Sequence, residues 1–280
     1  MIKVSHECPK SLFEKSKGFN DYEYCLAHLY ASDPEYRDFY KKQSASGREC
    51  ILDNSIFEGR GLSNEEFADI IMDLKPSHYI IPDVLEDTEA TIANMVKFKK
   101  DFPDLPGKVI CVVQGKTYEE LIKCYRAADK YGDKIAISFD YSYYESIYPQ
   151  YCKLDAWCRG RQSLISRLIM DGVWNGNKPH HLLGCGLAKE FNDPLYQKIS
   201  IESIDTSNPV VAGIKHMMYD GIHGLAEKPS VKLCDLIDYD IPIKDLPIVD
   251  YNITAFKRII GRRSGLQHFL ARLVLKYSTL

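Results

Sequence analysis

Residues 50–83 read CILDNSIFEGRGLSNEEFADIIMDLKPSHYIIPD, and the fold class follows from this one segment. Its apolar runs at Cys50–Asp53 and Tyr79–Ile81 are short, as buried parallel strands are. Between the runs, Ser63 and Glu66 form a capping box, and apolar side chains then recur on one face of a helix. A strand, a helix and a second strand in succession predict a βαβ unit.

The same alternation continues along the chain at intervals of roughly thirty residues. Further helices are expected from Asp87 to Lys100 and from Thr117 to Tyr131. The predicted strands are Ile2–Ser5, Cys50–Asp53, Tyr79–Ile81, Val109–Val113, Ile135–Phe139, His181–Leu183 and Ser203–Asp205. Repetition of the βαβ unit over 280 residues predicts an α/β fold, a TIM-type (β/α)8 barrel that forms a single domain over residues 1–280.

Two segments depart from this alternation. Residues 140–160 are rich in tyrosine and longer than an ordinary loop after a strand, so we expect them to lie over the site. Residues 215–251 are rich in glycine and proline, and the last units of the barrel are expected to be irregular, with no position assigned to the last strand. A basic helix is predicted at about 254–277, interrupted near Gly261 and Gly265.

Composition limits the class of protein. The formal net charge of −3 does not indicate a nucleic-acid partner, and no apolar run is long enough to cross a membrane. The nine cysteines are scattered without a C-x-x-C pair, which predicts reduced thiols and a cytoplasmic location. Charge is uneven, however, because residues 251–280 contain six Lys and Arg and no acid.

Carboxylates follow three of the predicted strands, at Asp53, Asp83 and Asp205. Because the active site of a barrel lies at the C-terminal ends of its strands, we expect these acids on one rim. Three carboxylates on one rim predict an enzyme. The alternative for each is a helix cap, and Asp83 or Asp87 could serve in that way.

Five segments occur in the order found in the tRNA-guanine transglycosylase superfamily, which the chain resembles. They are LDNSIF (52–57), PD (82–83), VVQG (112–115), HLLGCG (181–186) and SIDT (203–206). The resemblance covers about residues 50–208 and implies a barrel enzyme that exchanges a purine base on a nucleic acid.

The resemblance also implies catalytic roles. Asp205 is similar to the nucleophile that attacks C1′ of a guanosine, and Asp53 to the second catalytic Asp, which handles protons. The residue types suit this chemistry, because a carboxylate can trap an oxocarbenium-like sugar as a covalent intermediate. The second carboxyl group should then have a raised pKa.

The base-binding residues are implied in the same way. Asp83 and Gln114 resemble the residues that read the edge of guanine or a 7-deazaguanine, Phe57 an aromatic that stacks on the base, and Gly184 a backbone position beside it. An Asp can accept hydrogen bonds from guanine N1–H and N2–H, and Gln114 can donate to O6. From the residues alone, Phe57 could equally lie in the core, and Gln114 could satisfy a loop carbonyl.

The chain departs from the tRNA-acting members at their zinc site. Those members bind structural zinc through a C-x-C-x-x-C cluster and a distant His, whereas only Cys234, His216, His223 and His268 follow Asp205 here. One cysteine does not make such a site, so we predict no metal and no cofactor.

Compact relatives without this zinc site include the DNA-guanine transglycosylases, which insert 7-deazaguanines such as 7-cyano-7-deazaguanine into DNA and include virus-encoded forms. The resemblance therefore implies DNA as the polymer, with tRNA as the alternative, a free 7-deazaguanine base, and the cytoplasm of a bacterium or a virus-infected cell. The cations Arg258, Arg262, Arg263, Arg272 and Lys276 are expected to contact phosphates. Alternatively, this helix packs on the barrel and exposes its charges to solvent.

Two other functions fit carboxylates on a barrel rim. A retaining glycoside hydrolase also uses such a pair, although sugar sites favour tryptophan platforms and this chain has only Trp157 and Trp174. If Asp205 caps a helix, the alternative is a barrel that binds nucleic acid without catalysis. The tyrosines of residues 140–160 are expected to stack on a flipped-out base or, alternatively, to pack against the barrel.

Overall fold

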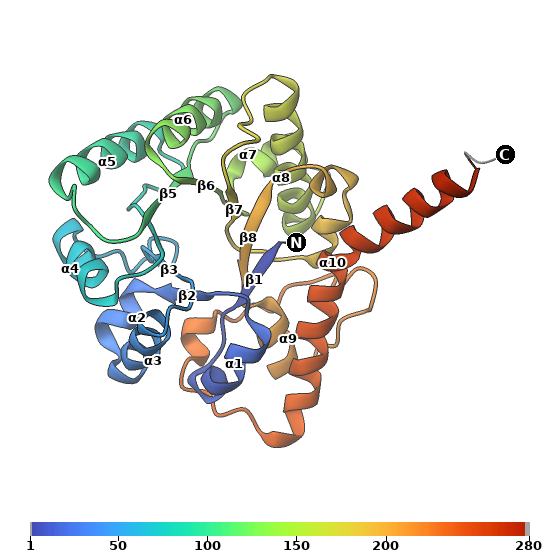
Figure 1. Ribbon diagram of the computed structural model, residues 1–280, viewed down its shortest axis with the longest axis horizontal. Helices are drawn as coiled ribbons and strands as arrows, with labels where there is room; N and C mark the ends of the chain where they lie inside the picture. Colours follow the sequence, from blue (N-terminus) through green and yellow to red (C-terminus); the bar gives the residue numbers. More distant parts are fainter. Residues whose placement is uncertain (1, 278–280) are drawn as a thin grey trace.

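The computed structural model describes residues 2–277, with side chains described as far as Gly261 except those of Pro194 and Gln197. Within this part of the chain, eight parallel strands form one sheet that curls into a barrel, and helices surround it (Figure 1). The order of the strands in the sheet follows the chain from β2 to β8 and then β1. The fold is therefore the predicted α/β barrel of the TIM type.

The elements alternate between strand and helix along most of the chain. The strands are β1 (Lys3–His6), β2 (Glu23–Leu26), β3 (Cys50–Asp53), β4 (His78–Ile80), β5 (Lys108–Val113), β6 (Lys134–Ile137), β7 (His180–Leu182) and β8 (Ile201–Thr206). The α-helices are α1 (Phe13–Phe19), α2 (Ala27–Ser32), α3 (Pro34–Ala45), α4 (Asn64–Leu74), α5 (Thr88–Asp101), α6 (Tyr118–Tyr131), α7 (Ser142–Ile147), α8 (Lys153–Met170), α9 (Asn208–Ile214) and α10 (Leu246–Tyr277). Short 3-10 helices are η1 (Lys10–Leu12), η2 (Ala188–Asn192), η3 (Pro194–Gln197), η4 (Leu233–Leu236) and η5 (Ile243–Asp245). Across the described residues, no helix has the combination of length and apolar character needed to cross a bilayer.

Three helices begin where the sequence indicates. Ser63 caps α4 and Thr117 caps α6, and in each case a Glu three residues later completes the capping box. Asp87 caps α5 by accepting a hydrogen bond from the Ala90 N–H. The three predicted helix starts are therefore confirmed. Each capping side chain accepts a hydrogen bond from a backbone N–H group that the first turn of a helix leaves free.

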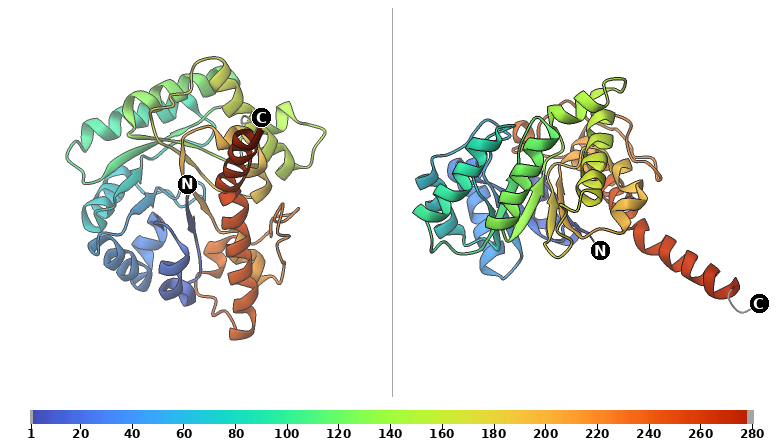
Figure 2. Two further views of the ribbon diagram at one scale, coloured as in Figure 1. Left: turned by 45° about the vertical axis from the view of Figure 1, so that its right-hand side comes forward. Right: turned by 90° about the horizontal axis from the view of Figure 1, so that it is seen from above.

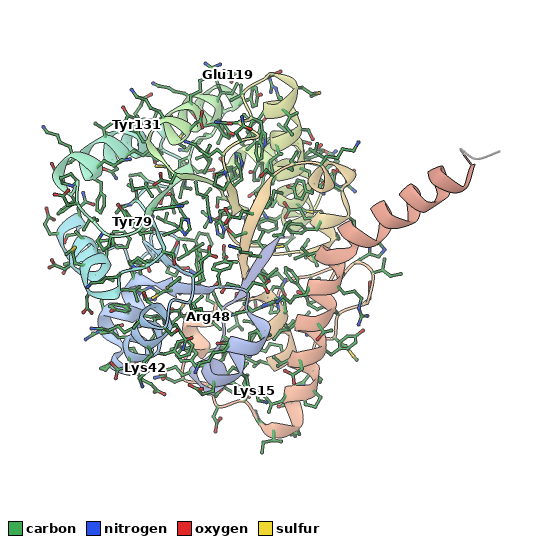
Figure 3. All side chains as sticks on the ribbon, viewed as in Figure 1. Lys15, Lys42, Arg48, Tyr79, Glu119 and Tyr131 are labelled. Atoms are coloured by element: carbon green, nitrogen blue, oxygen red, sulfur yellow. The ribbon has the colours of Figure 1, made fainter. Side chains whose placement is uncertain are left out.

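The sequence does not predict strand β2, and it assigns no position to the last strand of the barrel. The last strand is β8, while residues 215–251, all of which the structure describes, contain no strand and have an isolated bridge between Asp220 and Gly224 as their only β pairing. β2 reads EYCL and lacks the Val and Ile that mark most of the other strands. Its charged residue is satisfied internally, because Arg48, labelled in Figure 3, donates from Nε to Glu23 at 2.6 Å.

The sheet closes at a seam between its two edge strands, β1 and β2. Asp21 precedes β2, donates its backbone N–H to the Val4 carbonyl at 2.9 Å and accepts from the Val4 N–H at 2.9 Å. Lys257 of α10 donates to the Asp21 carboxylate and to the Phe19 carbonyl. The C-terminal helix therefore lies across the seam and ties down the chain that enters β2.

Helix α10 differs from its predicted bounds. It begins at Leu246 rather than near residue 254, and it continues without interruption past Gly261 to Tyr277. Packing fixes its early start, since Val249 and Phe256 are buried and a Cβ on Gly213 would lie only 2.6 Å from the Val249 side chain. Its last turns extend away from the barrel (Figure 2).

Candidate active site

A cavity of about 420 Å³ opens at the C-terminal ends of the strands. Each described strand contributes to its wall through its C-terminal end or the segment after it, from Glu7 after β1 to Thr206 at the end of β8. The residues named from the sequence that line it are Asp53, Phe57, Asp83, Gln114, Gly184 and Asp205. The structure thus brings the two predicted catalytic residues and the four predicted base-binding residues to one place.

Asp205 lies in β8 and is held by groups from the end of β7. Its Oδ1 lies 3.0 Å from His181 Nε2, and the Gly184 N–H is 3.1 Å from Oδ1 and 3.2 Å from Oδ2. It caps no helix, because α9 begins at Asn208 with Ser207 before it. The capping alternative for Asp205 is therefore wrong, and the donors around its oxygens suit an anionic carboxylate.

The peptide group between Leu183 and Gly184 is held from both sides. Arg161 Nη1 donates to the Leu183 carbonyl at 2.7 Å, while the Gly184 N–H donates to Asp205. Arg161 is completely buried and forms two hydrogen bonds of 2.7 Å with the Glu190 carboxylate. Gly184 has a φ of 58°, a left-handed conformation that favours glycine. Arg161 therefore orients the peptide that binds Asp205.

His181 joins Asp205 to a chain of polar groups inside the barrel. Its Nδ1 lies 2.9 Å from Ser203 Oγ, and Lys134 Nζ lies 3.5 Å from the same hydroxyl. Burial lowers the pKa of His181, so the ring is neutral at pH 7. A neutral ring that donates from Nε2 to Asp205 accepts at Nδ1 from Ser203, which in turn accepts from Lys134. This chain fixes both the tautomer and the orientation of His181.

Asp53, at the end of β3, is placed in a different environment. Its Oδ1 accepts from the Tyr24 hydroxyl at 2.9 Å and its Oδ2 from the Ser55 N–H at 2.7 Å. Burial raises the pKa of Asp53 well above its ordinary value, and the charges of Glu58 and Asp205 raise it further. A carboxyl group with a raised pKa can hold a proton at neutral pH and transfer it.

A second polar group lies on the wall contributed by β4 and β5. Gln114 Nε2 donates to Asp83 Oδ2 at 2.6 Å, and Asn54 Nδ2 donates to Asp83 Oδ1 at 2.7 Å. Gln114 is itself oriented by the Glu86 N–H, which donates to Oε1 at 2.9 Å. Asp83 caps no helix, since Asp87 caps α5. Burial raises the pKa of Asp83, and each of its oxygens has one further lone pair for a ligand N–H.

Aromatic side chains form much of the remaining wall. Phe139 and Trp157 make an edge-to-face contact with ring centroids 5.6 Å apart, and both line the cavity. Phe57 also lines the cavity and is 51% exposed, so the core alternative for this residue is wrong. These rings give the cavity flat apolar surfaces on which a heterocyclic base can stack.

The tyrosine-rich segment covers the cavity only in part. Tyr141, Tyr143 and Tyr144 are buried, and two of them donate their hydroxyls to the carbonyls of Val113 and Ser138. These three tyrosines pack against the barrel, so the expectation that they stack on a base is wrong. The segment contributes Asp140, Leu154 and Trp157 to the wall instead.

Several residues on or directly behind the cavity wall were not singled out from the sequence. Strand alternation could have located His181, which pairs with Ser203 in the sheet and points to the same interior as Asp205. Glu7 and Glu58 lie outside the strands, where no periodicity marks them. Burial raises the pKa of both, and the nearby charge of Asp205 raises it further.

Of the predicted phosphate contacts on α10, only Arg258 has a described side chain, and it does not line the cavity. Arg258 is exposed on α10, and the side chains of Arg262, Arg263, Arg272 and Lys276 lie outside the described residues. Of the α10 residues whose side chains are described, none lines the cavity. The first half of α10 packs on the barrel, which is the alternative given for this helix.

Of the histidines and the cysteine that follow Asp205, His268 lies outside the described side chains, and the other three lie apart. His216 Nδ1 is 3.7 Å from Asp245, His223 is near Asn192, and Cys234 lines the cavity. Among the described side chains, no group of three or more His, Cys, Asp or Glu is arranged to hold a metal ion.

No protein-family model matches the sequence, and no curated protein matches it. Among solved structures, a 2,3-dimethylmalate lyase, described as a PEP mutase/isocitrate lyase superfamily member, aligns with 16% identity and a TM-score of 0.47. The alignment covers 89% of this chain and 93% of the lyase chain. A likeness this distant does not bear on the reaction.

Proposed function

We propose that this protein replaces a guanine base in DNA with a free 7-deazaguanine, through a covalent intermediate on Asp205. The observation that supports the proposal is the presence, in one cavity, of two carboxyl groups in opposite environments. Asp205 is surrounded by hydrogen-bond donors, whereas burial and neighbouring acids raise the pKa of Asp53. Cleavage of an N-glycosidic bond requires both an anion to receive the sugar and an acid to protonate the leaving base.

In the first half of the reaction, a carboxylate oxygen of Asp205 attacks C1′ of the target nucleotide. The bond between C1′ and N9 breaks, and its electron pair leaves with guanine, which takes a proton from Asp53. The sugar is then held as an ester of Asp205. His181 and the Gly184 N–H position the nucleophile, because they bind its oxygens before the attack.

In the second half, the incoming base loses its N9 proton to the Asp53 carboxylate. Its N9 attacks C1′, the ester bond breaks, and Asp205 is released as a carboxylate. The net reaction exchanges one base for another and uses neither water nor a redox step. The apolar wall formed by Phe139, Trp157 and Leu183 favours exclusion of water, which would otherwise hydrolyse the ester.

The polar group around Asp83 suits the recognition of the base. Guanine and 7-deazaguanines present N1–H and N2–H donors on one edge, and Asp83 offers acceptors held in place by Asn54 and Gln114. Phe57 and Trp157 offer surfaces for the faces of the ring. A purine-like heterocycle therefore matches this wall better than a sugar does.

The decisive experiment traps the intermediate. The protein is incubated with a guanine-containing DNA oligonucleotide, denatured, and examined for a covalent protein–DNA adduct by intact mass. The wild-type protein should form the adduct and incorporate labelled guanine into DNA, whereas Asp205→Asn should do neither. Asp87→Asn is the matched control, because it makes the same chemical change at an exposed helix cap where Asn functions equally well.

Label in tRNA but not in DNA would show that the proposed polymer is wrong while the exchange chemistry stands. A folded Asp205→Asn protein that still incorporates guanine would overturn the mechanism. One observation favours a second candidate, a retaining glycoside hydrolase, because Trp157 lines the cavity as a sugar platform would. That enzyme would release sugar from a glycoside and would form no adduct with DNA.

A further inference from the structure

Residues 228–234, which lead into η4 and include its first two residues, form one side of the cavity mouth. Pro229 and Leu233 are buried and anchor this segment to the body of the protein. Lys228 and Lys232 lie next to these anchors and are exposed. Two ammonium groups are thereby carried by a fixed segment at the entrance, rather than by a free loop.

The two lysines are the only cationic side chains on the described wall of the cavity. Lys232 Nζ lies 5.7 Å from the centre of the Phe57 ring, so a cation and an exposed aromatic face are neighbours at the mouth. Both lysines also act electrostatically on Glu58, whose negative charge they favour. The mouth therefore joins positive charge to a surface on which a base can stack.

The interior of the same cavity is acidic, with Glu7, Asp53, Glu58 and Asp205 on its wall. An anionic group finds no cation in such an interior and is attracted to the cations at its entrance. A nucleotide in DNA has to bring its neutral base and sugar to Asp205 while its phosphates stay outside. The distribution of charge along the cavity matches this division of the substrate.

From this arrangement we infer that Lys228 and Lys232 form a phosphate-binding site that holds the phosphodiester groups flanking the target nucleotide. The inference rests on the proposed function, and it moves the principal phosphate contact from α10 to residues 228–232. Consistent with this placement, Lys257 of α10 is bound to Asp21, and no described side chain of α10 reaches the cavity.

The test measures DNA binding in the Asp205→Asn background, where the covalent step does not interfere. Affinity for a short single-stranded, guanine-containing DNA oligonucleotide is measured over a range of salt concentrations, with deoxyguanosine as the probe that lacks phosphate. Each lost phosphate contact lowers the log–log salt slope by about 0.7 for single strands, so Lys228→Ala with Lys232→Ala should lower it by roughly 1.4. Binding of deoxyguanosine should be unchanged.

Two control variants sharpen the result. Arg258→Ala removes an exposed cation from α10 and should leave the slope at the wild-type value, whereas Lys228→Arg with Lys232→Arg should retain it. An unchanged slope in the double alanine variant, or an equal loss in Arg258→Ala, would overturn the inference. Failure of the oligonucleotide to bind the Asp205→Asn protein itself would also overturn the inference.

The outcome is separable from that of the proposed function. A protein that forms the covalent adduct but shows an unchanged salt slope in the double alanine variant retains the function and loses this site. A protein whose slope depends on the two lysines but that forms no adduct retains the site and loses the function.

Discussion

The phenol ring of Tyr24 lies parallel to the imidazole ring of His181, with centroids 5.9 Å apart and an interplanar angle of 14°. The Tyr24 hydroxyl donates to Asp53, and His181 Nε2 binds Asp205. Each ring therefore positions one of the two carboxyl groups, and the stacked pair links them. Movement of the Tyr24 or His181 ring would therefore change the positions of both the Asp53 and the Asp205 carboxyl groups.

The contact between His181 and Asp205 should affect the chemical step more than binding. His181→Leu removes a hydrogen bond to a charged group, worth about 1.5–3 kcal/mol, so kcat should fall roughly 10–100-fold with little change in the Kd for DNA. His181→Gln keeps an N–H donor and should recover a large part of the loss. Equal rates for the two variants would show that the hydrogen bond does not matter.

The alkaline limit of activity should follow the pKa of Asp53, because the acid must carry its proton to protonate the leaving base. Glu58→Gln removes a negative charge that raises this pKa, so the alkaline limb of kcat should move to lower pH. Tyr24→Phe removes a hydrogen bond that lowers it, so the limb should move to higher pH. Shifts in the same direction in both pH–rate profiles would contradict the assignment of Asp53.

Stability should depend on pH through the same group. Because the pKa of Asp53 is higher in the folded protein than in the unfolded chain, the folded state binds more protons above about pH 4, and the free energy of unfolding falls as pH rises through that window. Asp53→Asn cannot ionise, so its melting temperature at pH 7 should exceed that of the wild type by about 2–4 °C for each kcal/mol gained. The difference between the two proteins should vanish below pH 4, as melting curves at several pH values would show.

Asp83 should govern affinity for the base and not for the polymer. Asp83→Ala leaves the N–H donors of a bound guanine without a buried acceptor, at a cost of about 1–3 kcal/mol, so its Kd for free guanine should rise roughly 5–150-fold. Calorimetry with free guanine and with the DNA oligonucleotide separates the two effects. A parallel loss of both affinities would indicate a folding defect or a different base pocket.

The buried ion pair between Arg161 and Glu190 should be important for stability. Arg161→Leu leaves the Glu190 carboxylate buried and unpaired, which costs about 3–5 kcal/mol in the free energy of unfolding. Arg167→Leu on the same helix is the matched control, because Arg167 is exposed and lies 3.9 Å from Asp171, so loss of this pair should change stability little. Similar denaturation midpoints for the two variants would show that the buried pair is not structurally important.

The sequence predicted those parts of the site that depend on strand position. Asp53 and Asp205 could be located because a parallel strand is short and apolar and the residue at its C-terminal end faces the rim. β2 was missed because Glu23 interrupts the apolar pattern, and only the folded chain shows Arg48 satisfying it. Glu58 and the two mouth lysines come from loops, whose path depends on tertiary packing rather than on any local pattern.

The position of α10 across the seam has a consequence for how the protein is made. On the ribosome, β1 and β2 leave the exit tunnel long before Lys257 is synthesised, so the seam between them waits for the helix that ties down Phe19 and Asp21. Until then the nascent barrel presents open strand edges, which are prone to pair with other chains. Emergence of Lys257, rather than emergence of the last strand, would then commit the barrel to its closed form, and chaperone binding would be needed most in the interval between the two.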